Sequence, residues 1–442
     1  MSPPMPIERV SANDATTLAT DRGPAPMNIG VLLRVDRGAE LSFDDVRGLL
    51  SSRVPLVPRL RQRIETTPPG CGRPIWVDAA DFDLRHHLQQ TALVEAAGTA
   101  EALTATADLV CAPLPGDRPL WAARWVTGFE DGSAALVISA HHCLADGLGG
   151  LAVLAALCDE GALGESVSRP FPSPPPRARE VATDAWRARR QALRRLPSRL
   201  ADTTAGVREL AGAPRRPRLA ERTSINRPTG PHRRLTTVET PLDALVAAAH
   251  AHGCTVNDLV LCAVAGAVGA LLRSRREHVT ELVASVPVSE RRAASAQRLG
   301  NHNGVMALAL PLVVDRDERL RRIAALTADR LRAERGTSSV PLGLGFRALA
   351  RLGAFQPFID HQRLVHTFVT NVRGPRVPWH VGGRPVTSVV PVAVTPGNVG
   401  VSFDVLSYAG RLTVSVVADP AAVPDQDVLT ASLAAELAQI GA

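Results

Sequence analysis

Residues 141–147 of the chain read His141-His142-Cys143-Leu144-Ala145-Asp146-Gly147. They follow residues 134–140, an apolar run typical of a buried strand, and precede residues 151–157, which have the composition of a helix. The two histidines therefore lie at the end of a predicted strand. Because neighbouring side chains on a strand point to opposite faces, the two histidines cannot share one role. We expect one of them to face a ligand while the other packs.

The residue types in this run suit proton transfer. Histidine is a general acid and base near neutrality, Asp146 tied to nearby cations would fix the loop, and Gly147 permits a tight bend. A histidine pair alone would favour core packing, but the Asp-Gly that follows favours a functional motif. A Cys143 nucleophile is not favoured, because Cys143 directly adjoins His142. A metal site is not favoured either, because adjacent histidines diverge and no third group of ligands is evident.

Patterning along the chain predicts a mixed α/β protein. Residues 120–129 and 134–140 are apolar runs on either side of Glu130-Asp131-Gly132-Ser133, which predicts a hairpin. Two helices are expected after residue 236, the second apolar on nearly all sides and so buried against a sheet; they cover residues 242–252 and 257–273. Valine-rich runs predict strands at residues 281–288, 365–372 and 412–417.

Length and composition indicate two lobes of an ordinary globular protein. The 442 residues suit two domains of about 200 residues each, and 45% of them are hydrophobic and 21% charged. The longest uncharged apolar run, residues 259–272, is shorter than the roughly 20 residues of a membrane-spanning helix. The first ten residues lack the basic and apolar segments of a secretory signal. We expect no spanning segment and a cytosolic location.

The chain contains no lysine, so all 50 basic residues are arginine. This excludes a Schiff-base lysine, covalent pyridoxal phosphate and a phosphate-loop lysine. The six cysteines form no Cys-x-x-Cys pair and are interpreted as reduced thiols.

A basic segment separates the two predicted lobes. Residues 177–234 contain 16 arginines and five acidic residues, a net charge of +11 in a chain of net charge +7. We place an N-terminal lobe at residues 1–165, a proline- and arginine-rich connection at 166–235, partly helical around 185–200, and a C-terminal lobe at 236–442. The arginines either form a solvated helix face and loop or bind an anionic surface or ligand.

The chain resembles the bacterial wax ester synthase/diacylglycerol acyltransferases, within the larger group of chloramphenicol-acetyltransferase-like and condensation enzymes. The His-His-x-x-x-Asp-Gly signature of that group is accompanied by further segments similar to motifs of the family, in the same order. These segments are residues 55–61, 72–76, 81–84, Pro119-Leu120-Trp121, residues 255–258, Gly300-Asn301, residues 371–375 and residues 406–411. Two positions depart from the family pattern: Cys143 stands where alanine is more common, and Arg373 replaces a common proline.

The resemblance implies two chloramphenicol-acetyltransferase-like lobes, each a mixed sheet with helices, and an active-site tunnel at their interface. It implies direct transfer from acyl-CoA to an alcohol, with His142 taking the hydroxyl proton, His141 as support and Asp146 fixing the loop. It assigns a substrate-binding role to a further set of residues: Gly147, Pro119, Leu120, Trp121, Asn257 and Asp258. A helix cap formed by Asn257 or Thr255, at the start of a buried helix, is an equal alternative. The family's chemistry proceeds without a thiol, and no metal or cofactor is implied besides acyl-CoA as co-substrate.

Three functions remain open at this point. The first is an acyl-CoA-dependent O-acyltransferase that acts on diacylglycerol or a long-chain alcohol and associates peripherally with the inner membrane face or a lipid droplet. The second is an acyltransferase of specialised metabolism that forms esters or amides, with a carrier protein as a possible donor. The third is a lipid-binding homologue without activity. A nucleic-acid partner is not expected.

Overall fold

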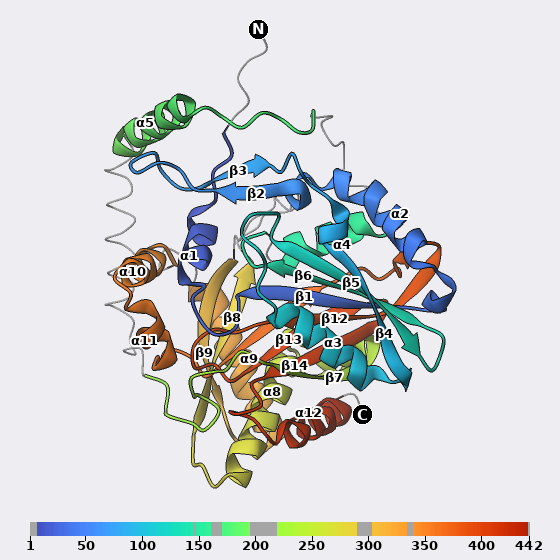
Figure 1. Cartoon of the computed structure of the whole chain (residues 1–442). Coiled ribbons are helices and arrows are strands. Elements are labelled where there is room, and N and C mark those ends of the chain that lie inside the picture. Colours follow the sequence, from blue (N-terminus) through green and yellow to red (C-terminus); the bar gives the residue numbers. More distant parts are fainter. Residues whose placement is uncertain are drawn as a thin grey trace.

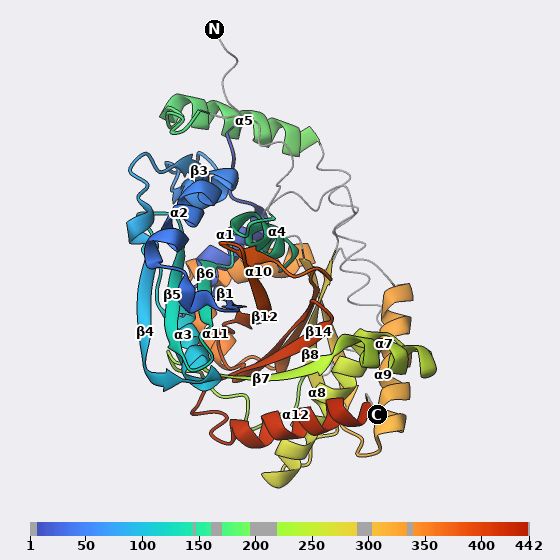
Figure 2. The ribbon, with the colours of Figure 1, turned by 90° about the vertical axis from the view of Figure 1, so that its right-hand side faces the viewer.

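The fold is given by a computed structural model that describes residues 7–144, 147–160, 170–194, 219–289, 303–333 and 339–440. Two six-stranded sheets lie side by side, and helices pack on both of them (Figures 1 and 2). Each sheet contains both parallel and antiparallel pairs. The predicted mixed α/β class with two sheet-containing lobes is confirmed.

The first sheet carries the histidine pair at the end of its central strand β6. Its strands, in spatial order, are β11 (His380–Val381), β12 (Arg384–Ala393), β1 (Asn28–Val35), β6 (Ala134–His141), β5 (Trp121–Phe129) and β4 (Leu88–Ala97). Helix α3 (Thr99–Cys111) packs on the face that carries Leu32 and Val137. Helices α2 (Phe43–Arg53) and α4 (Gly147–Leu157) pack on the opposite face, which carries Leu33 and Leu136. Alternate residues of β1 and β6 thus serve two separate cores.

The first sheet also contains strands from the other end of the chain. β12 pairs antiparallel with β1, with Leu33 opposite Val389. The sequence interpretation placed all of 236–442 in the C-terminal lobe, whereas β11 and β12 of that segment join the first sheet. A strand carries no local signal for which sheet it joins, because pairing is set by non-local contacts.

Helices also pack on the second sheet. Its strands, in spatial order, are β7 (Arg234–Pro241), β14 (Arg411–Ala418), β13 (Val401–Tyr408), β10 (Thr367–Arg373), β8 (Glu281–Ser289) and β9 (Asn303–Pro311). Helices α8 (Val256–Ser274) and α12 (Gln426–Ile440) share one core cluster with β13 and β14. α7 (Leu242–Ala251) and α9 (Arg316–Ala333) pack beside α8. α8 is long and apolar enough to cross a membrane by composition, but 78% of its apolar window is buried inside the protein.

The remaining elements lie outside the two six-stranded sheets and the helices described above. They are α1 (Ala12–Thr20), the 3₁₀ turns η1 (Gly38–Glu40), η2 (Val54–Leu56), η3 (Pro58–Arg61) and η4 (Leu84–His86), the small sheet of β2 (Gln62–Glu65) and β3 (Ile75–Asp78), α5 (Ala178–Arg194), α10 (Ser339–Arg351) and α11 (Phe355–Asp360). α5 lies at the far edge of the molecule, next to β2 and β3 (Figures 1 and 2).

Most of the expected local elements are present. The hairpin is β5 and β6, the helix after the histidines is α4, and the two later helices are α7 and α8. The three valine-rich runs are β8, β10 and β14. All six cysteines are free, as expected for reduced thiols.

Candidate active site

The histidine pair is fixed through its backbone. The His141 N–H donates to the carbonyl oxygen of Leu120 at 2.9 Å, and the His142 N–H donates to that of Met27 at 3.0 Å. His141 lies opposite Asn28 in the pairing of β6 with β1. Both histidine N–H groups are therefore held by the residues that immediately precede the two neighbouring strands, β5 and β1.

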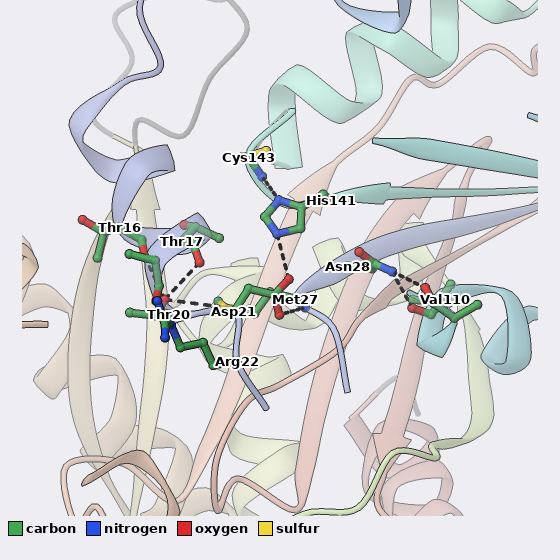
Figure 3. A network of polar contacts seen from close by, with 12 residues as sticks. Thr16, Thr17, Thr20, Asp21, Arg22, Met27, Asn28, Val110, His141 and Cys143 are labelled. Atoms are coloured by element: carbon green, nitrogen blue, oxygen red, sulfur yellow. Dashed lines mark hydrogen bonds and ion pairs between the residues drawn. The ribbon is translucent and has the colours of Figure 1, made fainter. Parts of the chain in front are cut away.

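The His141 ring has both nitrogens engaged (Figure 3). Its Nδ1 accepts from the Cys143 N–H at 3.1 Å, so Nε2 carries the proton and donates to Oδ2 of Asp21, also at 3.1 Å. Oδ1 of Asp21 accepts from the Met27 N–H at 3.0 Å, which fixes the carboxylate. The His141 residue is only 5% exposed. The first histidine is thus locked in one tautomer by two partners.

Asp21 was not found by sequence reasoning. It follows α1, 120 positions before His141, and a single aspartate at a helix end has no distinguishing local pattern. Asn28 was missed for the same reason. Its side-chain amide donates to the carbonyls of Val110 and Ala112, at the carboxyl end of α3 (Figure 3). It ties that helix to β1 beside His141.

A cavity of about 290 Å³ lies against His141. Its polar wall is formed by Asp21, Asn28 and His141. Its other wall is mostly apolar and comes from α1, the segment between α1 and β1, β2 and the segment between α3 and β5: Leu18, Pro26, Ile64, Pro113, Leu114, Gly116 and Leu120. The first histidine, which the sequence assigned to support, thus also faces a cavity. A larger cavity of about 570 Å³ is lined by residues of α2, η2 and residues 80–84 instead.

His142 follows β6 and is half-buried. Asp146, predicted to fix the loop, lies outside the described residues, and its role stays a prediction. Gly147 is the first residue of α4. The loop from the histidines therefore leads directly into a helix that packs on the sheet.

The Pro119-Leu120-Trp121 motif supports the histidines from β5. The carbonyl oxygen of Leu120 is the acceptor for His141, as described above. The Trp121 indole donates to Leu60 O at 2.8 Å, and its ring stacks on His87 with 4.6 Å between centroids. His87 is 2% exposed, and burial lowers its pKa. His87 is therefore a buried structural histidine that packs beneath Trp121.

Asn257 and Asp258 begin helix α8 in the second sheet's half of the molecule. Asp258 forms a capping box with Thr255, and its other carboxylate oxygen accepts from the Thr327 hydroxyl at 2.7 Å. The helix-cap alternative is therefore confirmed for Thr255, with Asp258 as its partner in the capping box. Asn257 instead contacts strand β10, since its Oδ1 accepts from Nδ2 of Asn371 at 3.2 Å.

The Cys143 thiol is unsuited to nucleophilic attack. The side chain is buried, and desolvation raises its pKa far above the usual value for a thiol. Cys143 would stay protonated at neutral pH.

Two family models match the chain. The model for the wax ester synthase/diacylglycerol acyltransferase catalytic domain matches residues 10–260, and that for the WS/DGAT C-terminal domain matches residues 299–441. The chain belongs to the wax ester synthase/diacylglycerol acyltransferase family. It is an acyltransferase of the diacylglycerol O-acyltransferase and wax ester synthase type.

Named relatives of this acyltransferase family match over nearly their whole length. A Mycobacterium tuberculosis protein named as a diacylglycerol O-acyltransferase is 28% identical, over 98% of this chain and 96% of its own. A second protein of that organism with the same designation is 30% identical, over 94% of this chain and 93% of its own.

Solved structures confirm the fold expected of the family. The wax ester synthase/diacylglycerol acyltransferase from Marinobacter aquaeolei superposes with a TM-score of 0.70 at 20% identity, covering 98% of both chains. The first condensation domain of the CDA synthetase superposes with a TM-score of 0.61 at 19% identity, covering 99% of this chain and 97% of that one. The chloramphenicol-acetyltransferase-like fold is therefore shared.

Proposed function

We propose that this acyltransferase moves a fatty acyl group directly from acyl-CoA to the hydroxyl of diacylglycerol or a long-chain alcohol, with His142 as the general base. The observation that carries the assignment is the engagement of both His141 ring nitrogens, by Cys143 and Asp21. His141 is therefore held as a structural group, and proton transfer is assigned to the half-buried His142, which directly follows β6 and whose N–H is fixed by Met27 O.

The acyl group passes directly to the acceptor, without an acyl-enzyme intermediate. His142 takes the hydroxyl proton while the hydroxyl oxygen attacks the thioester carbonyl carbon. The tetrahedral intermediate then collapses, the carbon–sulfur bond breaks, and the proton passes from His142 to the leaving CoA thiolate. The products are an ester and free CoA, and no cofactor takes part.

In this proposal the other residues of the site position the reacting groups. Asp21 and His141 hold the strand end, Asp146 fixes the loop before Gly147, and Leu120 supports the wall of the cavity. We call the junction between the two sheets the seam. Asn257, with Asn371, is the second sheet's contribution to it.

The substrate assignment is tested by an assay of the purified protein. Mixed acyl-CoAs are offered with diacylglycerol, a long-chain alcohol and a long-chain amine, and the products are identified by mass spectrometry. Triacylglycerol or wax ester as the main product supports the proposal. Amide as the main product, or transfer only from a carrier-protein thioester, would replace it with the specialised-metabolism alternative.

We also propose that the enzyme resides in the cytosol and docks on anionic lipid surfaces through α5. Only Val181 and Ala185 of this helix are buried among its described side chains. Trp186 is 60% exposed, and the Arg190 guanidinium lies 5.4 Å from its ring centroid. An exposed helix face with an aromatic ring among arginines suits a lipid interface.

Vesicle sedimentation tests this docking. Wild type should bind anionic vesicles, be released by salt, and bind neutral vesicles poorly. Arg187→Gln with Arg190→Gln should weaken binding and leave turnover of a soluble alcohol unchanged. Arg321→Gln with Arg322→Gln on α9 removes the same charge from another exposed helix and should have no effect. An equal loss of vesicle binding in both double variants would show that binding depends on net charge alone and not on α5.

A further inference from the structure

The open edge of β12 in the first sheet lies against β13 of the second sheet. The Val394 N–H donates to the carbonyl oxygen of Asn28, the first residue of β1, so the preceding N–H, that of Ala393, points away from β1. It donates to Oδ2 of Asp404 on β13 at 2.8 Å. A side chain of the second sheet thus takes the place of a neighbouring strand at this edge.

Asp404 is a buried carboxyl group held only by neutral donors. It is 2% exposed, and its Oδ1 accepts from the Thr370 hydroxyl at 2.9 Å. Within the described part of the chain, no charged side chain bonds to it. Buried carboxyls without a cationic partner are costly, so the fold accepts a penalty at this position.

The two partners of Asp404 lead to opposite sides of the proposed site. Ala393 lies opposite Ile29 on β1, and the adjacent Asn28 lies opposite His141 on β6. On the other side, Thr370 precedes Asn371, whose amide contacts Asn257.

We propose that Asp404 is a positioning residue that sets the separation between the strand end carrying His142 and the Asn257–Asn371 pair across the seam. The inference rests on the proposed function, because it takes His142 as the base. An error of about 1 Å between reacting groups can lower the rate on the order of 100-fold.

Tyr408 provides a matched control on the same strand. Four residues after Asp404, its hydroxyl accepts from the Trp379 N–H at 2.6 Å and donates to Val386 O at 3.1 Å. It therefore also binds the β12 region across the seam, but at the end remote from Ala393. Loss of this hydroxyl should weaken the seam without moving the histidine end.

The test compares kcat, KM and melting temperature for Asp404→Leu, Asp404→Asn and Tyr408→Phe. Asp404→Leu leaves the Ala393 N–H and Thr370 hydroxyl without an acceptor, and kcat should fall on the order of 10- to 100-fold with KM nearly unchanged. Asp404→Asn should restore most of kcat, because its amide oxygen still accepts from Ala393. Tyr408→Phe should lower the melting temperature and keep kcat.

Three results would overturn the proposal: a folded Asp404→Leu enzyme with wild-type kcat, an Asp404→Asn enzyme as slow as Asp404→Leu, or an equal loss of kcat in Tyr408→Phe. If Asp404→Leu does not fold, Thr370→Val removes only one of the two bonds and should still lower kcat, and an unchanged kcat there rejects the proposal. A failure of the His142 assignment is distinguishable, because it would appear as activity in His142→Ala.

Discussion

The Nε2 atom of His141 lies 3.1 Å from Oδ2 of Asp21, although 120 positions separate the two residues in the chain. The Cys143 N–H occupies the other ring nitrogen. The first histidine of the pair is therefore a fixed hydrogen-bonding group that connects α1 to the end of β6.

Asp21→Ala should destabilise the protein and lower activity. The buried imidazole N–H would lose its acceptor, which typically costs about 1–3 kcal/mol. Asp21→Asn should be milder, because an amide oxygen can still accept from His141. Thermal denaturation and steady-state kinetics of both variants check this, and an Asp21→Ala enzyme as stable and active as wild type would contradict it.

Cys143→Ala should keep near wild-type turnover, because burial raises the pKa of this thiol and leaves no thiolate for attack. Iodoacetamide should not alkylate Cys143 in the native enzyme at pH 8, as peptide mapping would show. Alkylation of Cys143 in native enzyme, or a folded but inactive Cys143→Ala variant, would reinstate a cysteine mechanism.

Asp404→Asn should change how stability depends on pH. Burial raises the pKa of Asp404 to about 7, whereas an unfolded aspartate has a pKa of about 3.9. The folded state therefore holds this proton more tightly, and the resulting stability is full below pH 4 and is lost as the pH rises through 7. The Asp404→Asn variant has no such loss. Its free energy of unfolding, relative to that of wild type, should therefore rise by about 1.4 kcal/mol for each pH unit between 4 and 7.

Urea denaturation of both proteins at several pH values from 5 to 8 measures this difference. All other titrating groups are common to the two proteins, so the difference isolates Asp404. A constant difference across the range would show that Asp404 is ionised in the fold throughout.

Local structure around the histidines followed from the sequence, because alternation and turn residues are local signals. The hairpin of β5 and β6 and the buried helix α8 were predicted in this way. The membership of β12 in the first sheet was not, and neither was the Asp21–His141 contact. Both depend on which distant segments meet, and single residues such as Asp21 carry no periodic pattern.

Among the motif residues, too, the sequence predicted local contacts and missed contacts between distant segments. Of the two expected cap residues, Asn257 and Thr255, Thr255 is the helix cap, and a cap is a local hydrogen-bonding pattern that the sequence can show. The partner of Asn257 on β10, and the position of Asp404 at the seam, required the two sheets to be brought together.

The central claim is that His142 is the general base, and pre-steady-state acyl transfer by His142→Ala tests it most directly. The account predicts a folded protein that binds acyl-CoA normally and transfers the acyl group about 10²- to 10⁴-fold more slowly. His252→Ala, which changes an exposed histidine at the end of α7, should transfer at the wild-type rate. Near wild-type transfer by a folded His142→Ala enzyme would contradict the account.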